Sequence, residues 1–213
     1  MLGCSIMKKI FYIFTRQYMT KNEFDLLLQK TSATDIVQKY ILDGIPFCFQ
    51  ENPGLYDIFR QTICNRFQIH PQNFTIVGSA KVGFSMAPEK YGNPFSEESD
   101  IDVVLVSEDL FQNLWLKLIE FKRTTVYKLS KYQRDRFNEF QSILFYGNIR
   151  LDMISADFPF VREWWEFFNT ISLDDRFGPR RIRARIFKSW SHVSFYYENG
   201  IRKIKEQNES NSI

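Results

Sequence analysis

The feature of the sequence that most constrains the fold is a pair of aspartates at the entrance to an unbroken apolar run. Asp100 and Asp102 flank Ile101, and Val103-Val104-Leu105-Val106 follows directly. A run of this length, rich in β-branched residues, is typical of a buried strand. Because side chains two apart on a strand point to the same face, both carboxylates should project together. The sequence therefore predicts a strand over 101–106 with a carboxylate pair at its start.

Such a carboxylate pair suits a hard divalent cation. Mg²⁺ prefers oxygen ligands and often takes only one or two carboxylates together with the phosphates of a substrate. An Asp-x-Asp motif alone is weak evidence, because the ordinary alternative is a solvated turn at the beginning of a strand. The surrounding residues decide between the two.

Upstream, a second apolar run ends in a glycine-serine pair. Phe74-Thr-Ile-Val77 predicts another buried strand, which leads into Gly78 and Ser79 and then into a short helix over 80–86. Backbone N–H groups at a helix start, beside a glycine that permits close approach, suit a phosphate group, and Ser79 adds a hydroxyl. The alternative is a plain strand-to-helix turn.

Downstream, a third strand is predicted from Asn148 to Ile154. Its alternation directs Arg150 and Asp152 to one face and apolar side chains to the other. If this strand lies beside the first two, Asp152 can join Asp100 and Asp102. Three converging carboxylates would repel one another unless cations neutralised them. Asp157, which lies beyond the strand, is the fallback third carboxylate.

The rest of the chain favours helices, so the fold class is α+β, with a small mixed sheet flanked by helices. Capping residues predict N-terminal helices over 21–30 and 33–43, and Asn52-Pro53 predicts a third that ends before His70. Further helices are expected over 108–121, 130–141 and 159–171, and a long C-terminal helix from Pro179 to about Lys205. The expected organisation is a core with N-terminal helices over 1–155 and a C-terminal helical region over 156–213 packed on that core.

A basic stretch lies at the start of the expected last helix, at positions Arg176, Arg180, Arg181, Arg183, Arg185 and Lys188. On a helix, Arg181, Arg185 and Lys188 share one face with His192. This face would reach a triphosphate or an acceptor phosphate. The alternative is a solvated basic face paired with nearby acids such as Asp174 and Asp175.

Composition excludes several classes of protein. The chain has 213 residues, enough for one ordinary domain, and a net charge of +3, which does not require a nucleic-acid partner. Aromatic residues are unusually frequent at 17%; most should form the core, and a few suit stacking on bases. The apolar run over 10–14 is too short for an export signal, and no transmembrane span is expected. Cys4, Cys48 and Cys64 lack metal-ligand spacing, as do the two histidines, which favours reduced thiols and a cytoplasmic protein without a zinc site.

Taken together, Gly78-Ser79, Ser99-Asp100-Ile101-Asp102 with its apolar run, and Asp152 resemble the signature of the DNA polymerase β-like nucleotidyltransferase superfamily. The resemblance covers residues 74–154. It implies a nucleotidyltransferase core with two Mg²⁺ or Mn²⁺ ions held by Asp100, Asp102 and Asp152, and a nucleotide whose terminal phosphates lie against Gly78 and Ser79. Roughly 3.5–4 Å would separate two such ions, which stabilise the attacking and leaving oxygens.

One departure from this family is a long insertion. Twenty residues separate Ser79 from Asp100, more than is usual in the family, and the extra stretch over 87–95 is rich in Pro and Gly. A loop at this point of the chain could cover a bound nucleotide. Lys81, Lys90 and Tyr91 are then candidates for contacts with the triphosphate or base, with surface exposure as the alternative.

The resemblance implies an enzyme that transfers a nucleotide from an NTP or dNTP to an acceptor hydroxyl. By analogy with stand-alone bacterial enzymes, we expect a nucleotide or oligonucleotide signal for a neighbouring effector in anti-phage defence. The alternatives are an antitoxin-like enzyme that modifies or neutralises a partner toxin protein, and a catalytically idle module that binds nucleotides or nucleic acid. Nucleic acid is a possible acceptor or product, and no membrane partner is expected.

Overall fold

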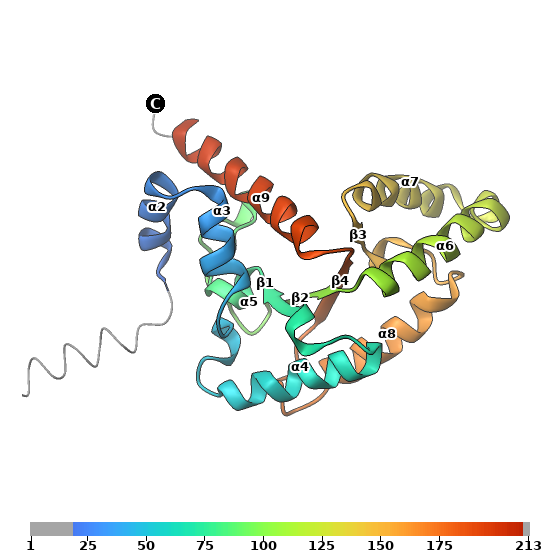
Figure 1. Ribbon diagram of the computed structural model, residues 1–213, viewed down its shortest axis with the longest axis horizontal. Helices are drawn as coiled ribbons and strands as arrows, with labels where there is room; N and C mark the ends of the chain where they lie inside the picture. The colour runs from blue at the N-terminus through green and yellow to red at the C-terminus, as the bar shows by residue number, and fades with distance from the viewer. Residues whose placement is uncertain (1–18, 211–213) are drawn as a thin grey trace, which may run out of the picture.

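A four-stranded mixed sheet forms the centre of the molecule. The computed structural model describes residues 19–210 (Figure 1); Cys4 and the apolar run over 10–14 lie outside this range. The strands are β1 (Phe74–Val77), β2 (Ile101–Val106), β3 (Asn148–Ile149) and β4 (Ile182–Phe187), in the order β1-β2-β4-β3. β1 is antiparallel to β2, β4 is parallel to β2, and β3 is antiparallel to β4. The expected α+β class is confirmed.

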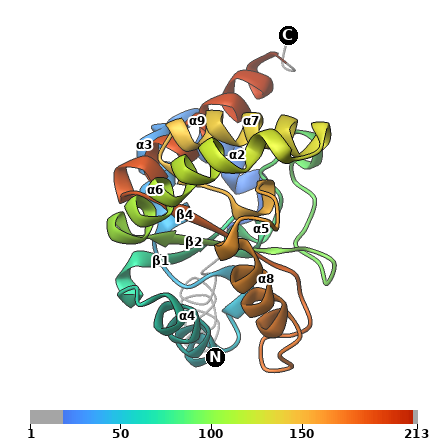
Figure 2. The same ribbon diagram turned by 90° about the vertical axis from the view of Figure 1, so that its right-hand side faces the viewer.

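Eight α-helices surround this sheet within the described residues. They are α2 (Lys21–Lys30), α3 (Ala33–Ile36), α4 (Pro53–Phe67), α5 (Ser79–Val82), α6 (Glu108–Thr124), α7 (Lys131–Phe145), α8 (Pro159–Ser172) and α9 (Trp190–Ser210). A π-helical turn, Val37–Leu42, continues α3. Figure 2 shows α4 and α8 on one side of the sheet and α3 and α9 on the other.

The two faces of the sheet pack into two separate apolar clusters. Ile101, Val103 and Leu105 of β2 pack in a large cluster with residues of α4, α6, α7 and α8. Val104 and Val106 belong to a second cluster, formed with α2, α3 and α9. Since alternate residues of a strand point to opposite faces, Asp102 projects on the side of the second cluster. Asp102 therefore lies on the side of the sheet covered by the N- and C-terminal helices.

Most of the predicted helices are confirmed because their capping residues act locally. Thr20 and Glu23 form a reciprocal capping box at the start of α2, and the Ser32 side chain accepts a hydrogen bond from the backbone of Asp35. Asn52 caps α4 in the same way, with Pro53 in the first turn. Helix starts that depend on neighbours three residues away can be read from the sequence directly.

The predicted long helix from Pro179 is wrong in its first part. Residues Ile182–Phe187 form β4, and the helix begins only at Trp190 and continues to Ser210. Ile182, Ala184 and Ile186 are buried in the large cluster, whereas Arg183 and Arg185 project on the opposite face. The region over 156–213 therefore supplies a strand between β2 and β3, in addition to its helices.

The predicted third strand is also wrong over most of its length. Only Asn148–Ile149 are strand, and Leu151–Met153 form a 3-10 turn that contains Asp152. The short helix expected over 80–86 is shorter, Ser79–Val82. The loop over 87–95 folds back on itself, with the Phe95 amide donating to the Gly83 carbonyl, and Tyr91 donates to Asp25 of α2 at 2.7 Å. Tyr91 thus ties the loop to α2.

Candidate functional site

The site begins where β1 ends beside the start of β2. Val77 lies opposite Asp102 in the antiparallel pair, so Gly78 follows directly beside that carboxylate. Gly78 has φ +68° and ψ −152°, a conformation that side-chain-bearing residues avoid. A Cβ at this position would lie 3.0 Å from Oδ2 of Asp102. Glycine is therefore required for the close approach, and the predicted meeting of Gly78-Ser79 with the Asp-x-Asp motif is present.

The two carboxylates of β2 differ in their surroundings. Asp100 forms an ion pair with Arg183 at 2.7 Å. Asp102 is more deeply enclosed, and burial raises its pKa above the usual value; Asp100 adds to this effect, while Arg185 and Arg183 partly oppose it. A cation bound at this point would favour the ionised form of Asp102.

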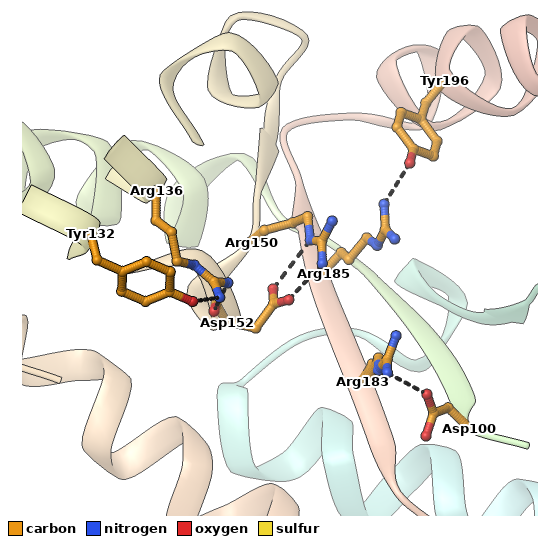
Figure 3. Close-up of polar contacts among 8 residues, drawn as sticks. All are labelled: Asp100, Tyr132, Arg136, Arg150, Asp152, Arg183, Arg185 and Tyr196. Atoms are coloured by element: carbon orange, nitrogen blue, oxygen red, sulfur yellow. Dashed lines mark hydrogen bonds and ion pairs between the residues drawn. The ribbon is translucent and has the colours of Figure 1, made fainter. Parts of the chain in front are cut away.

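Strand β4 places two arginines next to these carboxylates. Arg183 lies opposite Asp102 in the parallel register, and Arg185 lies opposite Val104. Arg185 donates to the Tyr196 hydroxyl at 2.7 Å, and its guanidinium lies 5.3 Å from the centre of that ring (Figure 3). This fixed guanidinium is suited to bind an anionic group, because it presents several donors in a rigid plane.

Asp152 does not join the other two aspartates. Strand β4 lies between β2 and β3, and Arg150 binds both carboxylate oxygens of Asp152, at 3.2 and 2.6 Å (Figure 3). Burial alone would raise the pKa of Asp152, but this arginine lowers it below the usual value. Arg136 of α7 also donates to the Asp152 carbonyl at 2.7 Å. The prediction that Asp152 completes a cluster of three carboxylates is wrong, because a strand carrying arginines intervenes.

The fallback carboxylate does not complete the cluster either. Asp157 is exposed and accepts a hydrogen bond from Ser155 at 2.7 Å. Within residues 19–210, no group of three or more His, Cys, Asp or Glu side chains is placed to hold a metal ion. Asp100 and Asp102 provide two oxygen ligands on one face, a set that suits a single Mg²⁺ completed by substrate phosphates. Among residues 19–210, the second expected ion lacks a third carboxylate next to this pair.

A pocket of about 990 Å³ opens over the Gly78–Asp102 contact. Gly78, Ser79, Asp102 and Arg185 line one part of it, and residues of α9 between His192 and Glu206 line another. Ser85, Met86 and Ala87, at the beginning of the long loop, also line it. Ligand pockets usually have volumes of about 300–1,000 Å³, and this pocket lies at the upper end of that range. It is therefore the primary candidate binding site.

Lys81, predicted to contact nucleotide, is buried and points elsewhere. Its ammonium donates to the carbonyl oxygens of Asp43 and Gly44, the second at 2.6 Å, and burial lowers its pKa to about 8. Lys81 therefore holds the turn before α4 in place. It does not line the pocket.

Of the other predicted nucleotide contacts, Gly78, Ser79 and Arg185 line the pocket, whereas Ser99, Arg181 and Lys188 do not. Ser99 accepts a hydrogen bond from the Ser96 amide at 3.0 Å. Arg181 is exposed, and its carbonyl accepts from Ile101. Lys188 lies 3.8 Å from Glu108. Arg181, Arg185, Lys188 and His192 do not share a helix face, because the first two belong to the extended segment at β4.

Aromatic side chains along the pocket were not identified from the sequence. Phe145 and Tyr146 at the end of α7 are 85% and 60% exposed, and Phe195 of α9 is 65% exposed. All three line the pocket, as does Tyr196. The available signal was aromatic content, which does not separate exposed rings from core rings.

Comparison with protein-family models, with curated proteins and with solved structures finds no match to the chain. Among residues 19–210, no helix combines the length and apolar character needed to cross a bilayer.

Proposed function

We propose that the pocket binds a nucleoside triphosphate and that the protein transfers a nucleotide from it to an acceptor hydroxyl. The observation that carries this proposal is the contact of Gly78 with Asp102 at the floor of a large pocket. A glycine required for close backbone approach, next to a carboxylate pair, combines a phosphate site with a ligand set for Mg²⁺ or Mn²⁺. Asp100 and Asp102 would hold one such ion, which neutralises phosphate charge when bound.

The phosphates are assigned to the end of the pocket formed by Gly78, Ser79 and Arg185. Helix α5 is a single turn, Ser79–Val82, so its dipole contributes little. The guanidinium of Arg185 is the stronger anion-binding group, and Tyr196 holds it in place. Exposed aromatic rings elsewhere in the pocket are suited to stack on the base.

In the proposed reaction the acceptor oxygen forms a bond to the α-phosphorus of the triphosphate. The bond from that phosphorus to the bridging oxygen breaks, and pyrophosphate leaves with the electron pair. The acceptor proton passes to water. Positioning and charge stabilisation supply most of the rate in such transfers, so a site with few reactive side chains is sufficient.

A second candidate is a module that binds nucleotides without transferring them. The observation that favours it is the position of Arg183, which lies opposite Asp102 and forms an ion pair with Asp100. An arginine that occupies a carboxylate competes with a cation for it. Binding with Mg²⁺ and turnover must therefore be measured separately.

The wider role is proposed from the family resemblance alone. It is a nucleotide or oligonucleotide signal made in the cytoplasm for an effector in anti-phage defence, with modification or neutralisation of a partner toxin protein as the alternative.

The test measures binding and turnover on the same samples. Each ribo- and deoxyribonucleoside triphosphate is titrated into the protein in the presence of Mg²⁺ or Mn²⁺, and the heat of binding is measured by calorimetry. The products in the same samples are then identified by mass spectrometry. We expect binding of at least one triphosphate and release of pyrophosphate. The Asp100→Ala/Asp102→Ala variant should lose turnover by at least about a hundredfold, since both oxygen ligands are removed.

Two further variants make this test specific. Asp135→Ala removes an exposed carboxylate of α7 and should leave binding and turnover unchanged. Asp152→Ala should retain turnover, because Arg150 and β4 separate that residue from the pocket floor. Turnover that survives loss of Asp100 and Asp102 contradicts the proposed site, and binding without any product supports the idle module.

A further inference from the structure

The outer face of α6 carries large apolar side chains that remain uncovered within residues 19–210. Trp115 is 39% exposed, Leu116 57% and Ile119 52%. Leu116 and Ile119 lie on the side of the helix opposite to the buried Leu114 and Leu118, and Trp115 lies at the border between the two sides. Figure 1 shows α6 at the end of the molecule opposite to α2. Neighbouring apolar side chains that stay exposed on one helix face are typical of a surface that binds a partner.

Charged side chains of opposite sign lie at the two ends of this apolar face. The first turn of α6 carries Glu108 and Asp109, and its last turn carries Lys122 and Arg123. Asp109 and Arg123 each lie seven residues from Leu116, in opposite directions along the helix. Seven residues are nearly two full turns, so both side chains lie within about 20° of the direction of Leu116. The exposed face therefore runs from an acidic end, through an apolar centre, to a basic end.

Such a face is complementary to itself when two copies of the helix pack antiparallel. A two-fold axis beside Leu116 brings the acidic end of each helix against the basic end of the other, and it places the two Leu116 side chains together. Antiparallel packing also sets opposite ends of the two helix dipoles side by side. A parallel arrangement would instead place acidic residues against acidic residues and basic residues against basic residues, which is unfavourable.

Arg123 also has an acidic neighbour on its own helix. Its guanidinium lies 2.8 Å from the carboxylate of Glu120, and the two side chains are 76% and 57% exposed. An exposed ion pair of this kind contributes little to stability. Because a guanidinium has five N–H donors, Arg123 can keep this pair and still bind the Asp109 carboxylate of a second copy.

We infer that α6 is the interface of a two-fold homodimer of this protein. Leu116 and Ile119 of the two copies pack at its centre, and Asp109 of each copy pairs with Arg123 of the other. The occupant is a second copy because opposite charges lie at equal distances on either side of Leu116, as a self-complementary interface requires. A helix of 17 residues is about 26 Å long, so the interface is small and the dimer is weak. This inference does not depend on the proposed nucleotide transfer.

The first test measures association of the full chain. Analytical ultracentrifugation, over concentrations from about 1 μM to about 1 mM, should show a dimer whose share rises with concentration. Leu116→Arg should weaken association by at least about tenfold, because two guanidinium groups would meet at the axis. Leu26→Arg is the matched control: Leu26 is a leucine of 55% exposure on α2, and its replacement should leave association unchanged.

The second test examines the antiparallel register by exchanging charges. Asp109→Arg alone and Arg123→Asp alone should each associate more weakly than the wild type, because like charges would meet at both ends of the interface. An equimolar mixture of these two variants should form a heterodimer, since each charge of one variant then meets its opposite in the other. Recovery in the mixture also shows that neither variant is weakened merely by misfolding.

The outcomes decide the inference whatever the nucleotide assays show. A protein that stays monomeric at every concentration overturns it, and so does equal association by the Leu116→Arg and Leu26→Arg variants. A mixture that associates no better than its two components overturns the antiparallel pairing of Asp109 with Arg123. Loss of the dimer with Leu116→Arg, together with recovery in the mixture, supports the interface.

Discussion

At the scale of single residues, Asp102 shows how the site conflicts with stability. The carboxylate is needed as an ion ligand in the proposed function, yet burial raises its pKa, so folding opposes its ionised form. For an acid whose folded-state pKa exceeds its unfolded value, stability is lost as the pH rises from the unfolded pKa through the folded one. The free protein carries this cost in full once the pH exceeds the folded-state pKa of Asp102.

Asp102→Asn is expected to stabilise the protein at pH 7, since a neutral amide of the same shape removes the cost of ionisation. Its advantage over the wild type should shrink as the pH falls, and should vanish below the unfolded pKa of about 3.9, where both proteins are neutral at this position. Urea unfolding at several pH values, without divalent ions, measures this difference. Asp135→Asn, at an exposed position, should show no such trend. If the Asp102→Asn protein is less stable than the wild type at pH 7, the ionised carboxylate of Asp102 does not destabilise the fold as argued.

The position of a site residue could be predicted from the sequence where it depends only on two strands that follow one another in the chain. Gly78 and Asp102 lie at the ends of two short apolar runs, and both runs form the strands expected. Asp152 could not be placed, because its distance from Asp102 depends on which strand lies between them. That strand, β4, comes from residues 182–187, far along the chain.

At the scale of elements, the turn from β1 to α5 depends on one glycine. Gly78→Ala should lower the free energy of unfolding by about 1–3 kcal/mol through backbone strain. The total loss should exceed this range, because the new Cβ would also lie 3.0 Å from an oxygen of Asp102. Chemical denaturation measures the loss. Gly178→Ala is the matched control, because Gly178 also has positive φ, at +75°, but open space around it. Equal losses in the two variants would show that the Asp102 contact contributes nothing.

Strand β4 shows why the sequence pattern predicts a helix where the structure has a strand. Ile182 and Ile186 are four residues apart, a spacing that places two side chains on one face of either a helix or a strand. The residue between them, Ala184, is also buried, which only the strand period explains. Ala has high helix propensity, so the local preference opposed the observed strand, and pairing with both β2 and β3 overrode it.

At the scale of the whole molecule, the sheet joins segments distant in the sequence. Strand β4 pairs along its full length with β2 on one side, and on the other side Ile186 and Phe187 pair with the two-residue strand β3. Helix α9, from the same C-terminal region, packs beside α2 and α3 and covers the face that carries Asp102 (Figure 1). The C-terminal region thus forms part of the core. It also supplies the arginines of the pocket and the rings of Phe195 and Tyr196, whereas the exposed rings of Phe145 and Tyr146 come from the end of α7.

This arrangement predicts that residues 1–155 do not fold alone. Without β4, the long edge of β2 has no partner and the cluster beneath α9 loses its cover, so the fragment should show neither a cooperative urea transition nor ordered aromatic signals in near-ultraviolet circular dichroism. Adding residues 156–213 as a separate chain should restore both signals, because that fragment contains the missing strand and helix. The full chain, measured alongside, provides the reference transition. A cooperative transition from residues 1–155 by themselves would mean that a stable sheet forms without β4, and would divide the protein into independent units at residue 155.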